Sequence, residues 1–383
     1  MEIFLFACKF IKFKEVFKLN EAFMKRALEI AEKGSGYVNP NPMVGAVIVK
    51  DNRIVGEGYH EKFGGNHAEV NALNMAAKDA EGSELYVTLE PCSHYGKTPP
   101  CALAVVKAGI KRVIIAMEDP NPLVSTKGIK ILKENGIEVI TGVMKKESEK
   151  LNEVFIKYIT TKRPFITMKM ASTLDGKICT VSGESRWISG QTSRKYVHHL
   201  RSKYMSIMVG VGTAINDNPL LTTRIEGESL RSPIAIIVDS KLRVPKDLRI
   251  FNTLQERKII IATTEYADKN KENKLITMGV SIIKTPNKNG RVNLDYLLDE
   301  LGKIGIDSVL LEGGSELNFS FIKEENIDKI MCFIAPMIVG GEKAKGAVGG
   351  EGIEKLKDSI KIYDMNSEKI GEDILVSGYL NRG

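Results

Sequence analysis

The sequence predicts an α/β protein with two domains. At 383 residues the chain exceeds one ordinary domain, and its content of 43% apolar and 27% charged residues is typical of globular proteins with buried cores. Strand-like runs alternate with helical patterns along the chain, as in sheets covered by helices. The two halves carry different motifs, and no internal repeat is visible. We therefore expect domains at residues 20–144 and 164–383, with an extension at 1–19 and a connector at 145–163.

The elements of the first domain follow from periodicity and from residues that end helices. Asn20 is a good helix N-cap, and apolar residues at helical spacing follow it until Gly34. Two strand-like runs, 44–50 and 53–57, flank a hairpin turn. The remaining expected elements are a helix from His67, a strand at 85–89, a helix from Cys101 to Gly109, a strand at 113–117, a helix at 128–135 and a strand at 137–141. Together they predict three layers around a mixed sheet.

The connector and the second domain are also expected from their patterns. Residues 145–163 are charged and helical in pattern, with Leu151, Phe155 and Tyr158 as the apolar positions. Pro164 then opens a second α/β unit. Its expected strands are 165–170, 206–211, 234–239, 258–262, 280–283 and 308–312.

A metal-binding pattern lies between His67 and Cys101. One imidazole and two thiols, those of Cys92 and Cys101, give the three protein ligands of a catalytic zinc site, whose fourth position stays open for water. Glu69 is close enough in sequence to reach that water, which ionises near neutral pH on zinc. The alternatives are a surface histidine beside a solvated acid, and two buried apolar thiols. The combination, with Pro91 before the first cysteine, favours zinc and resembles the signature of zinc-dependent nucleobase deaminases.

Two glycine-rich corners mark the second half. Residues 312–315 and 210–213 each follow a strand, and glycine lets the backbone approach a phosphate at a helix N-terminus. Neither corner is the dinucleotide fingerprint Gly-x-Gly-x-x-Gly, so tight turns alone remain an alternative. Arg201 and Arg224 could bind a phosphate, although each alone is more often a solvated charge. Trp187, the only tryptophan, is more often a core residue than a ligand platform.

Composition and charge argue against several classes of protein. The net charge of +7 comes from interspersed charges without a basic stripe, so we expect no nucleic-acid partner. No run reaches the ~20 apolar residues of a membrane span, and residues 1–19 lack a signal-peptide cleavage site. Five cysteines, an odd number, argue for a reducing compartment. We expect a cytoplasmic homo-oligomer that acts on a small molecule and does not bind a membrane.

With these residues in view, the sequence resembles the bifunctional pyrimidine deaminase/reductase family of riboflavin biosynthesis, from about Asn20 to near the C-terminus. In the first half the resemblance lies in Asn39-Pro40-Asn41-Pro42-Met43-Val44-Gly45, His67-Ala68-Glu69-Val70, residues 86–101 and Asp119-Pro120-Asn121-Pro122. In the second half it lies in residues 171–177, residues 182–188, Asp217-Asn218-Pro219 and Glu312-Gly313-Gly314. The long gap between the two cysteines and the coupling of the two motif sets make the resemblance specific.

This resemblance implies two folds and two reactions. The first domain would have a cytidine-deaminase-like three-layer α/β/α fold and would hydrolytically deaminate 2,5-diamino-6-(5-phosphoribosylamino)pyrimidin-4(3H)-one. The second would have a dihydrofolate-reductase-like α/β fold and would reduce the ribosyl side chain of 5-amino-6-(5-phosphoribosylamino)uracil to ribityl. The implied substrates are phosphorylated pyrimidines, and the implied cofactors are zinc and NADPH.

The family motifs also imply roles for individual residues. In the deaminase, Glu69 would be catalytic and the zinc ligands would be His67, Cys92 and Cys101. The deaminase substrate would contact Asn41, His60, His94 and Lys97. The reductase substrate would contact Lys169, Asp175, Ser185, Arg201, Leu221, Arg224 and Glu312. NADPH would contact Ala171, Trp187, Thr213, Asp217, Ser240, Gly313, Gly314, Ser315, Glu316 and Leu317.

Two positions depart from the family pattern. Leu103 stands where an acidic residue is common, and Thr126 stands where a glycine is usual. Three other hypotheses remain at this stage: a deaminase acting on a base in nucleic acid, a non-enzymatic binder of a phosphorylated pyrimidine, and a chain with one active half. The sequence lacks the basic or aromatic pattern that the first hypothesis requires. The intact set of His67, Glu69, Cys92 and Cys101 argues against the second hypothesis.

Overall fold

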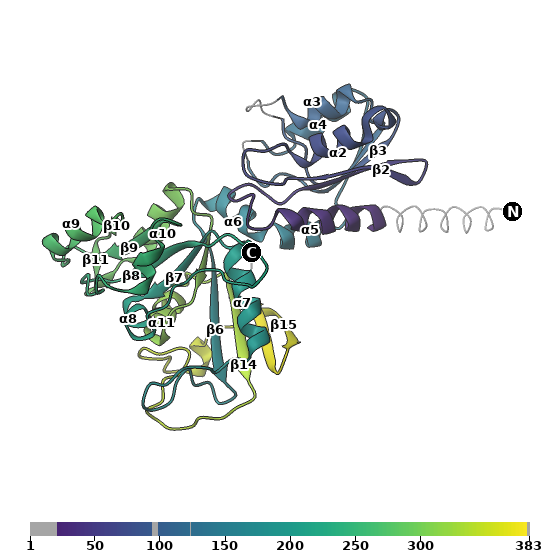
Figure 1. Cartoon of the computed structure of the whole chain (residues 1–383). Helices are drawn as coiled ribbons and strands as arrows, with labels where there is room; N and C mark the ends of the chain where they lie inside the picture. The colour runs from purple at the N-terminus through teal and green to yellow at the C-terminus, as the bar shows by residue number, and fades with distance from the viewer. Residues whose placement is uncertain (1–20, 94–98, 123, 381–383) are drawn as a thin grey trace. The chain divides into compact units, whose positions relative to one another are not determined.

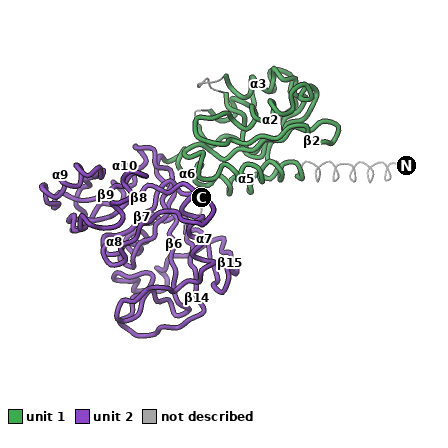
Figure 2. Tube along the Cα trace, in the orientation of Figure 1, with its two compact units in different colours: residues 1–161 green, residues 162–383 purple. Residues whose placement is uncertain are grey.

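The computed structural model describes residues 21–93, 99–122 and 124–380. The chain divides into two compact units, residues 1–161 and 162–383 (Figure 2). The predicted extension at 1–19 and the predicted N-cap Asn20 lie outside the described residues. No helix in the described ranges combines the length and the apolar character that a bilayer crossing requires.

Unit 1 contains a five-stranded mixed sheet in the order β2-β1-β3-β4-β5. Its strands are β1 (Gly45–Lys50), β2 (Arg53–Tyr59), β3 (Glu84–Leu89), β4 (Arg112–Met117) and β5 (Glu138–Thr141). Strand β1 is antiparallel to β2 and β3, whereas β3, β4 and β5 are parallel. Asp51 and Asn52 both have positive φ, as a two-residue hairpin turn requires. The predicted mixed sheet is confirmed.

Helices cover both faces of this sheet (Figure 1). Ala46 and Ile48 of β1 pack in the core that includes α2, α3 and α4. Val47, between them in sequence, points to the opposite face and packs with Met24 and Ile30 of the helix at residues 21–31. Among the described residues before 144, the helices of unit 1 are 21–31, η1 (Glu32–Gly34), α2 (Ala68–Ala76), η2 (Ala77–Ala80), α3 (Cys101–Lys107) and α4 (Lys127–Glu134). This is the three-layer α/β/α arrangement that the resemblance implied.

The segment that we expected to be a connector forms two helices, α5 (Lys145–Leu151) and α6 (Glu153–Thr161), and both lie within unit 1. The Ser148 hydroxyl donates to the carbonyl of Thr88 at 2.7 Å. The Asn152 side chain, which is buried, accepts from the Met43 N–H at 2.8 Å and donates to its carbonyl at 3.0 Å. These bonds attach the segment to the β1 and β3 region, and Asn152 separates the two helices.

Unit 2 contains a nine-stranded sheet in the order β10-β9-β8-β7-β13-β6-β14-β16-β15. The first seven strands in this order are parallel, and β16 and β15 add antiparallel pairs at one edge. The strands of unit 2 are β6 (Phe165–Thr173), β7 (Ser206–Gly210), β8 (Ile234–Val238), β9 (Ile259–Thr263), β10 (Ser281–Lys284), β11 (Asn287–Lys288), β12 (Arg291–Val292), β13 (Ser308–Leu311), β14 (Lys329–Ala335), β15 (Tyr363–Ile370) and β16 (Asp373–Tyr379).

Alternating side chains bury both faces of this second sheet. Leu311 of β13 packs in a core with Leu297 and Phe321, which belong to α10 and α11. Leu310, its neighbour, packs with Leu200 of α7. The helices of unit 2 are α7 (Gln191–Lys203), α8 (Val211–Asp217), η3 (Arg249–Thr253), α9 (Lys269–Thr277), α10 (Leu294–Lys303), α11 (Ser315–Lys323) and η4 (Leu356–Asp358).

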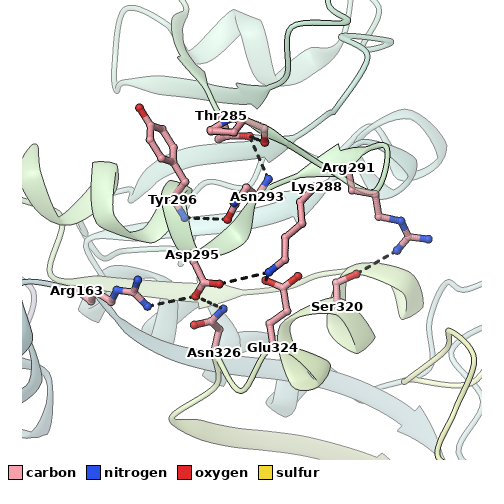
Figure 3. A network of polar contacts seen from close by, with 11 residues as sticks. Arg163, Thr285, Lys288, Arg291, Asn293, Asp295, Tyr296, Ser320, Glu324 and Asn326 are labelled. Carbon is pink, nitrogen blue, oxygen red and sulfur yellow. Dashed lines mark hydrogen bonds and ion pairs between the residues drawn. The ribbon is translucent and has the colours of Figure 1, made fainter.

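The β11–β12 hairpin is held beside α10 and α11 by a polar network (Figure 3). Lys288 pairs with Asp295 at 3.5 Å and with Glu324 at 3.2 Å. The Val292 N–H donates to the Ser240 hydroxyl at 3.0 Å. The hairpin therefore reaches a residue that the resemblance assigns to the cofactor site.

Candidate active sites of the two units

The three predicted metal ligands of unit 1 meet at the starts of two helices. His67 is the N-cap of α2, Cys101 is the first residue of α3, and Cys92 lies three residues beyond β3. The His67 Nδ1 atom lies 3.6 Å from Cys92 Sγ and 3.2 Å from Cys101 Sγ, and the three ligand atoms are all within 4.8 Å of one another. One ring nitrogen and two sulfurs at this spacing fit Zn²⁺, which prefers tetrahedral nitrogen and thiolate ligands.

Glu69 is buried beside these ligands, in the first turn of α2. Burial, and then the nearby negative charge of Cys92, raises the pKa of its carboxyl to about 7. A carboxyl with a pKa near neutrality can both accept and donate a proton under working conditions. A hydrogen bond from Cys101, opposed by burial and assisted by His67, lowers the pKa of the Cys92 thiol. The site therefore favours a thiolate, the form that binds metal.

Asn41 and His60, two predicted substrate residues, lie beside the metal ligands. Asn41 Nδ2 and His60 Nε2 are 3.2 Å apart, and His60 Nδ1 is 2.9 Å from the carbonyl oxygen of Asn66. The rings of His60 and His67 meet edge to face with centroids 5.6 Å apart. Burial lowers the pKa of His60, which favours its neutral ring. The other two predicted substrate residues, His94 and Lys97, lie outside the described residues.

The predicted cofactor residues of unit 2 follow or end four neighbouring parallel strands, β8, β7, β13 and β6. Open α/β sheets bind ligands at the carboxyl edge of their strands. The residues at this edge are Ala171 in β6, Thr213 and Asp217 in α8, Ser240 after β8, and Gly313, Gly314, Ser315, Glu316 and Leu317 after β13. The strand topology therefore brings together segments that are more than a hundred residues apart in sequence.

The corner after β13 has too little space for a Cβ atom at two positions, because other side chains lie close to its backbone. A Cβ atom on Gly313 would lie 2.6 Å from Asn318 Oδ1, and one on Gly314 would lie 2.9 Å from Thr213 Oγ1. Gly314 is also the N-cap of α11, and as a glycine it has no side chain that could cap this helix. Free N–H groups at a helix N-terminus bind phosphate, so the corner fits the pyrophosphate of a dinucleotide cofactor.

Trp187 is exposed, so its more common role as a core residue does not apply here. Its side chain is 67% exposed, and the Arg194 guanidinium lies 4.6 Å from its ring centroid. Arg186, its neighbour, donates to the carbonyl of Asp217 at the end of α8. The loop that carries Trp187 is thus attached to another predicted cofactor residue.

Arg201 and Glu312, two predicted substrate residues, form a bidentate ion pair with each other. The Arg201 Nε and Nη2 atoms each lie 2.8 Å from a Glu312 carboxylate oxygen. Burial favours a higher pKa for Glu312, but Arg201 and then Lys169 lower it to about 2. Burial lowers the pKa of Lys169, and Glu312 opposes that effect. These three groups form one charged centre, in which Glu312 occupies the guanidinium fork of Arg201.

The remaining substrate predictions fall on three loops. Ser185 lies half-buried in the Trp187 loop, whereas Leu221 is buried with φ of 55° and Arg224 is exposed. The Asp175 carboxylate accepts from the Thr173 hydroxyl at 2.5 Å and from the Gly340 N–H at 2.7 Å. These hydrogen bonds, with the Thr173 contribution largest, lower the pKa of Asp175 to about 2. Asp175 therefore joins the turn after β6 to the segment after β14.

Two family models match the chain. Residues 18–117 match the cytidine and deoxycytidylate deaminase zinc-binding region, and residues 164–376 match the RibD C-terminal domain. The riboflavin biosynthesis protein RibD of Actinobacillus pleuropneumoniae is 47% identical over 354 residues, which cover 92% of this chain and 93% of that protein. The chain belongs to the RibD family.

Solved structures agree with this membership in the RibD family. Acinetobacter baumannii RibD, form 1, matches with a TM-score of 0.87 and 35% identity, covering 96% of this chain and all of that one. A diaminohydroxyphosphoribosylaminopyrimidine deaminase/5-amino-6-(5-phosphoribosylamino)uracil reductase from Thermotoga maritima matches with a TM-score of 0.83 and 39% identity, covering 95% and 99% of the two chains. The predicted two-domain α/β fold is confirmed, and the chain is a bifunctional deaminase and reductase of riboflavin biosynthesis with a zinc-binding deaminase domain and an NADPH-dependent reductase domain.

Sequence reasoning missed Arg257, which holds a segment of predicted substrate residues in unit 2. This buried side chain donates to the carbonyls of Leu220 and Leu221, with 2.7 Å to the latter. Arg201 donates to the next carbonyl, that of Thr222, at 3.2 Å. Two arginines therefore fix three consecutive peptide groups that lead to Arg224. The local pattern around Arg257 gave no signal of this role, because Leu221 and Leu220 are 36 and 37 residues away in sequence.

Proposed function

We propose that unit 1 deaminates 2,5-diamino-6-(5-phosphoribosylamino)pyrimidin-4(3H)-one by hydrolysis, and that unit 2 then reduces the ribosyl side chain of 5-amino-6-(5-phosphoribosylamino)uracil with NADPH. The observation that carries the first step is the cluster of His67, Cys92 and Cys101 with the buried Glu69 beside it. Membership in the RibD family supports the order of the two reactions.

In the deaminase unit, His67, Cys92 and Cys101 would hold zinc. Bound zinc lowers the pKa of a water molecule and so provides a nucleophile at neutral pH. Glu69 would take up a proton from the nucleophile and pass it to the departing ammonia, a role that suits a carboxyl whose pKa is raised to about 7 by burial. Asn41 and His60, which contact each other beside His67, would hold the pyrimidine. We propose the same role for His94 and Lys97.

In the reductase unit, the residues at the carboxyl edge of the sheet would bind the cofactor, which supplies the hydride. The corner from Gly313 to Leu317 would hold the pyrophosphate, because α11 begins there with N–H groups that lack helical partners. The further cofactor contacts in this proposal are Ala171, Trp187, Thr213, Asp217 and Ser240.

The substrate of the reductase would lie over the charged centre of Lys169, Arg201 and Glu312. A phosphorylated sugar needs cationic and hydrogen-bonding partners, and Arg224 offers an exposed guanidinium next to this centre. Ser185 and Leu221 complete the proposed contacts, and Asp175 would act by holding the loop at the end of β6.

A two-part turnover assay on purified, zinc-loaded protein tests this proposal. Ammonia release from the diaminopyrimidine phosphate is measured first, and the loss of NADPH absorbance is followed afterwards. We expect NADPH consumption only after ammonia has appeared. Ammonia release without NADPH consumption would contradict the role of unit 2, and the absence of both would contradict the whole proposal.

We also propose that the chain forms a homo-oligomer in the cytoplasm. Large apolar side chains of unit 2 are well exposed, among them Leu174 at 68%, Ile338 at 74% and Leu356 at 93%, and burial against a second copy would remove them from water. The four cysteines in the described residues are free thiols, as a reducing compartment allows. Light scattering after size exclusion tests the first point, and cell fractionation tests the second.

A further inference from the structure

Glu90 lies two residues before the zinc ligand Cys92, and its side chain is almost completely buried at 5% exposure. Its carboxylate accepts hydrogen bonds from four backbone N–H groups of one segment, residues 119–129. Oε2 lies 3.1 Å from Asp119 N and 3.0 Å from Thr126 N. Oε1 lies 2.9 Å from Gly128 N and 3.2 Å from Ile129 N. One side chain therefore holds both ends of the 119–129 segment.

These four bonds compensate for the burial of a charge. Among the described residues no lysine or arginine forms an ion pair with Glu90, so backbone N–H groups provide its stabilisation. Gly128 and Ile129 are in the first turn of α4, where N–H groups lack helical partners and the helix dipole favours an anion. Charge-assisted hydrogen bonds of this kind are stronger than neutral ones. The carboxylate is thus fixed in position by the segment that surrounds it.

The position of Glu90 is transmitted to Cys92 through a short and stiff connection. Only Pro91 separates the two residues, and its ring restricts the backbone torsion φ. Gly128 packs directly against this proline, because a Cβ atom on it would lie 2.0 Å from the Pro91 carbonyl oxygen. The Glu90 carboxylate and the Gly128 backbone therefore fix the peptide that leads to the cysteine from two directions.

The same contacts explain the Asp-Pro-Asn-Pro motif at 119–122, which has no role in the proposed chemistry. The Asp119 carboxylate accepts from the Asn121 N–H at 2.8 Å, and the Asn121 carbonyl accepts from the N–H groups of Val124 and Ser125. The motif thus folds into a turn that presents the Asp119 N–H to Glu90. The motif therefore supports the metal site without providing a ligand.

We propose that Glu90 is a positioning residue of the deaminase: by binding the 119–129 segment it fixes the backbone of Cys92, and so determines how tightly the His67, Cys92 and Cys101 set retains zinc. The proposal rests on the proposed function only in assuming that this set binds zinc. It requires no turnover, so it can be tested even if the substrate assignment fails.

The test compares Glu90→Gln with Glu134→Gln, a surface change on α4 where only an i,i+4 pair with Lys130 is lost. In Glu90→Gln an NH₂ group replaces one carboxylate oxygen, and each of these oxygens accepts from two backbone N–H groups. A donor would then face two donors, so about half of the four hydrogen bonds are lost. We expect zinc transfer to a chromogenic chelator to become about tenfold faster in Glu90→Gln, at the low end of what supporting residues of metal sites cost. Glu134→Gln should release zinc at the rate of the unchanged protein.

Three further readouts separate positioning from general weakening of the fold. The thiolate absorption bands of the cobalt-substituted protein should change in Glu90→Gln, ammonia release should fall, and NADPH consumption with the deaminated substrate should not change. Unaltered zinc release and an unaltered cobalt spectrum, even with a lower melting temperature, would overturn the proposal. If Glu90→Gln does not fold, Gly128→Ala tests the same contact from the other side, because its methyl group displaces the Pro91 carbonyl. Normal zinc release in a folded Gly128→Ala would also overturn it.

Discussion

Glu69 is a buried carboxyl next to three metal-ligating side chains, and this position allows a sharp test of its role. Glu69→Gln keeps the shape and leaves His67, Cys92 and Cys101 in place, but the amide cannot exchange a proton. We expect ammonia release to fall at least about 100-fold, the lower end of what general acid–base groups contribute. Zinc content, measured by metal analysis, should stay the same. Retained turnover in a zinc-loaded variant would contradict the proposed role of Glu69.

Thr126, where the resemblance implies a glycine, has a backbone conformation that favours glycine. Its φ is 63°, a left-handed conformation that β-branched residues rarely adopt. Thr126→Gly should relieve backbone strain of about 1–3 kcal/mol. The added conformational freedom of glycine in the unfolded chain should offset about 0.5–1 kcal/mol of this gain. We therefore expect unit 1 to gain about 1 kcal/mol of unfolding free energy in urea titrations.

The neighbouring substitution Ser125→Gly is the matched control for Thr126→Gly. Ser125 is not among the residues with positive φ, so glycine there brings only the entropic cost and should lower stability. Equal effects of the two substitutions would show that the strain at Thr126 is not the cause. The N–H of residue 126 remains in both variants, so its bond to Glu90 is kept.

At the scale of the elements, the Arg201–Glu312 pair joins α7 to the end of β13. Arg201→Ala removes a cation but leaves the Glu312 carboxylate in a site where the pair is only 14% and 12% exposed. Breaking a buried pair in this way costs about 3–5 kcal/mol, so we expect a large loss in the stability of unit 2 besides weaker substrate binding. Ammonia release should be unaffected. Unchanged urea unfolding of unit 2 would contradict a structural contribution of the pair.

The pH dependence of unit 2 should reflect the same pair. The pKa of Glu312 is lowered to about 2 in the folded protein, against about 4.3 for a free glutamate. A carboxyl whose pKa is lower when folded contributes full stability above its unfolded pKa, and this contribution is lost as the pH falls from about 4 to about 2. Glu312→Gln should remove that contribution. Its unfolding free energy should therefore decline less steeply over this interval than that of the unchanged protein.

Local sequence patterns predicted the elements well where the signal is contained in a few residues. The runs at 85–89 and 113–117 form β3 and β4, and the glycine corner at 313–314 precedes α11. The pattern did not predict β14, β15 and β16. Strand β15 has exposed residues at most positions, so it lacks the buried alternation that marks a strand in sequence.

Contacts between distant residues could not be predicted for a different reason. Arg201 and Glu312 are 111 residues apart, and only the order of the strands in the sheet brings them together. Each was therefore predicted as a ligand for substrate and not as a partner of the other. The role of Glu90 could not be predicted, because its four partners lie 29 to 39 residues further along the chain. Asn152, likewise, ends α5 through bonds to Met43 that no local pattern contains. The cluster of His67, Cys92 and Cys101 could be predicted, because one imidazole and two thiols at this spacing are typical of a zinc site.

At the scale of the whole molecule, the residues proposed for the two chemistries lie in separate units. The described metal-ligand cluster belongs to unit 1, and the glycine corner and the Arg201–Glu312 centre belong to unit 2. Each unit also has its own sheet and its own cores. Zinc removal should therefore affect one activity only. This separation predicts the outcome of a chelation experiment on the full chain.

We expect dialysis against a strong zinc chelator to abolish ammonia release and to lower the melting temperature of unit 1, because metal binding to the folded ligand set stabilises it by mass action. NADPH consumption should continue at its original rate when the deaminated pyrimidine is supplied directly. Added Zn²⁺ should restore ammonia release, whereas Mg²⁺, which prefers oxygen ligands, should not. Loss of both activities on chelation would mean that the reductase depends on the folded state of unit 1, and the two units would then act as one cooperative structure.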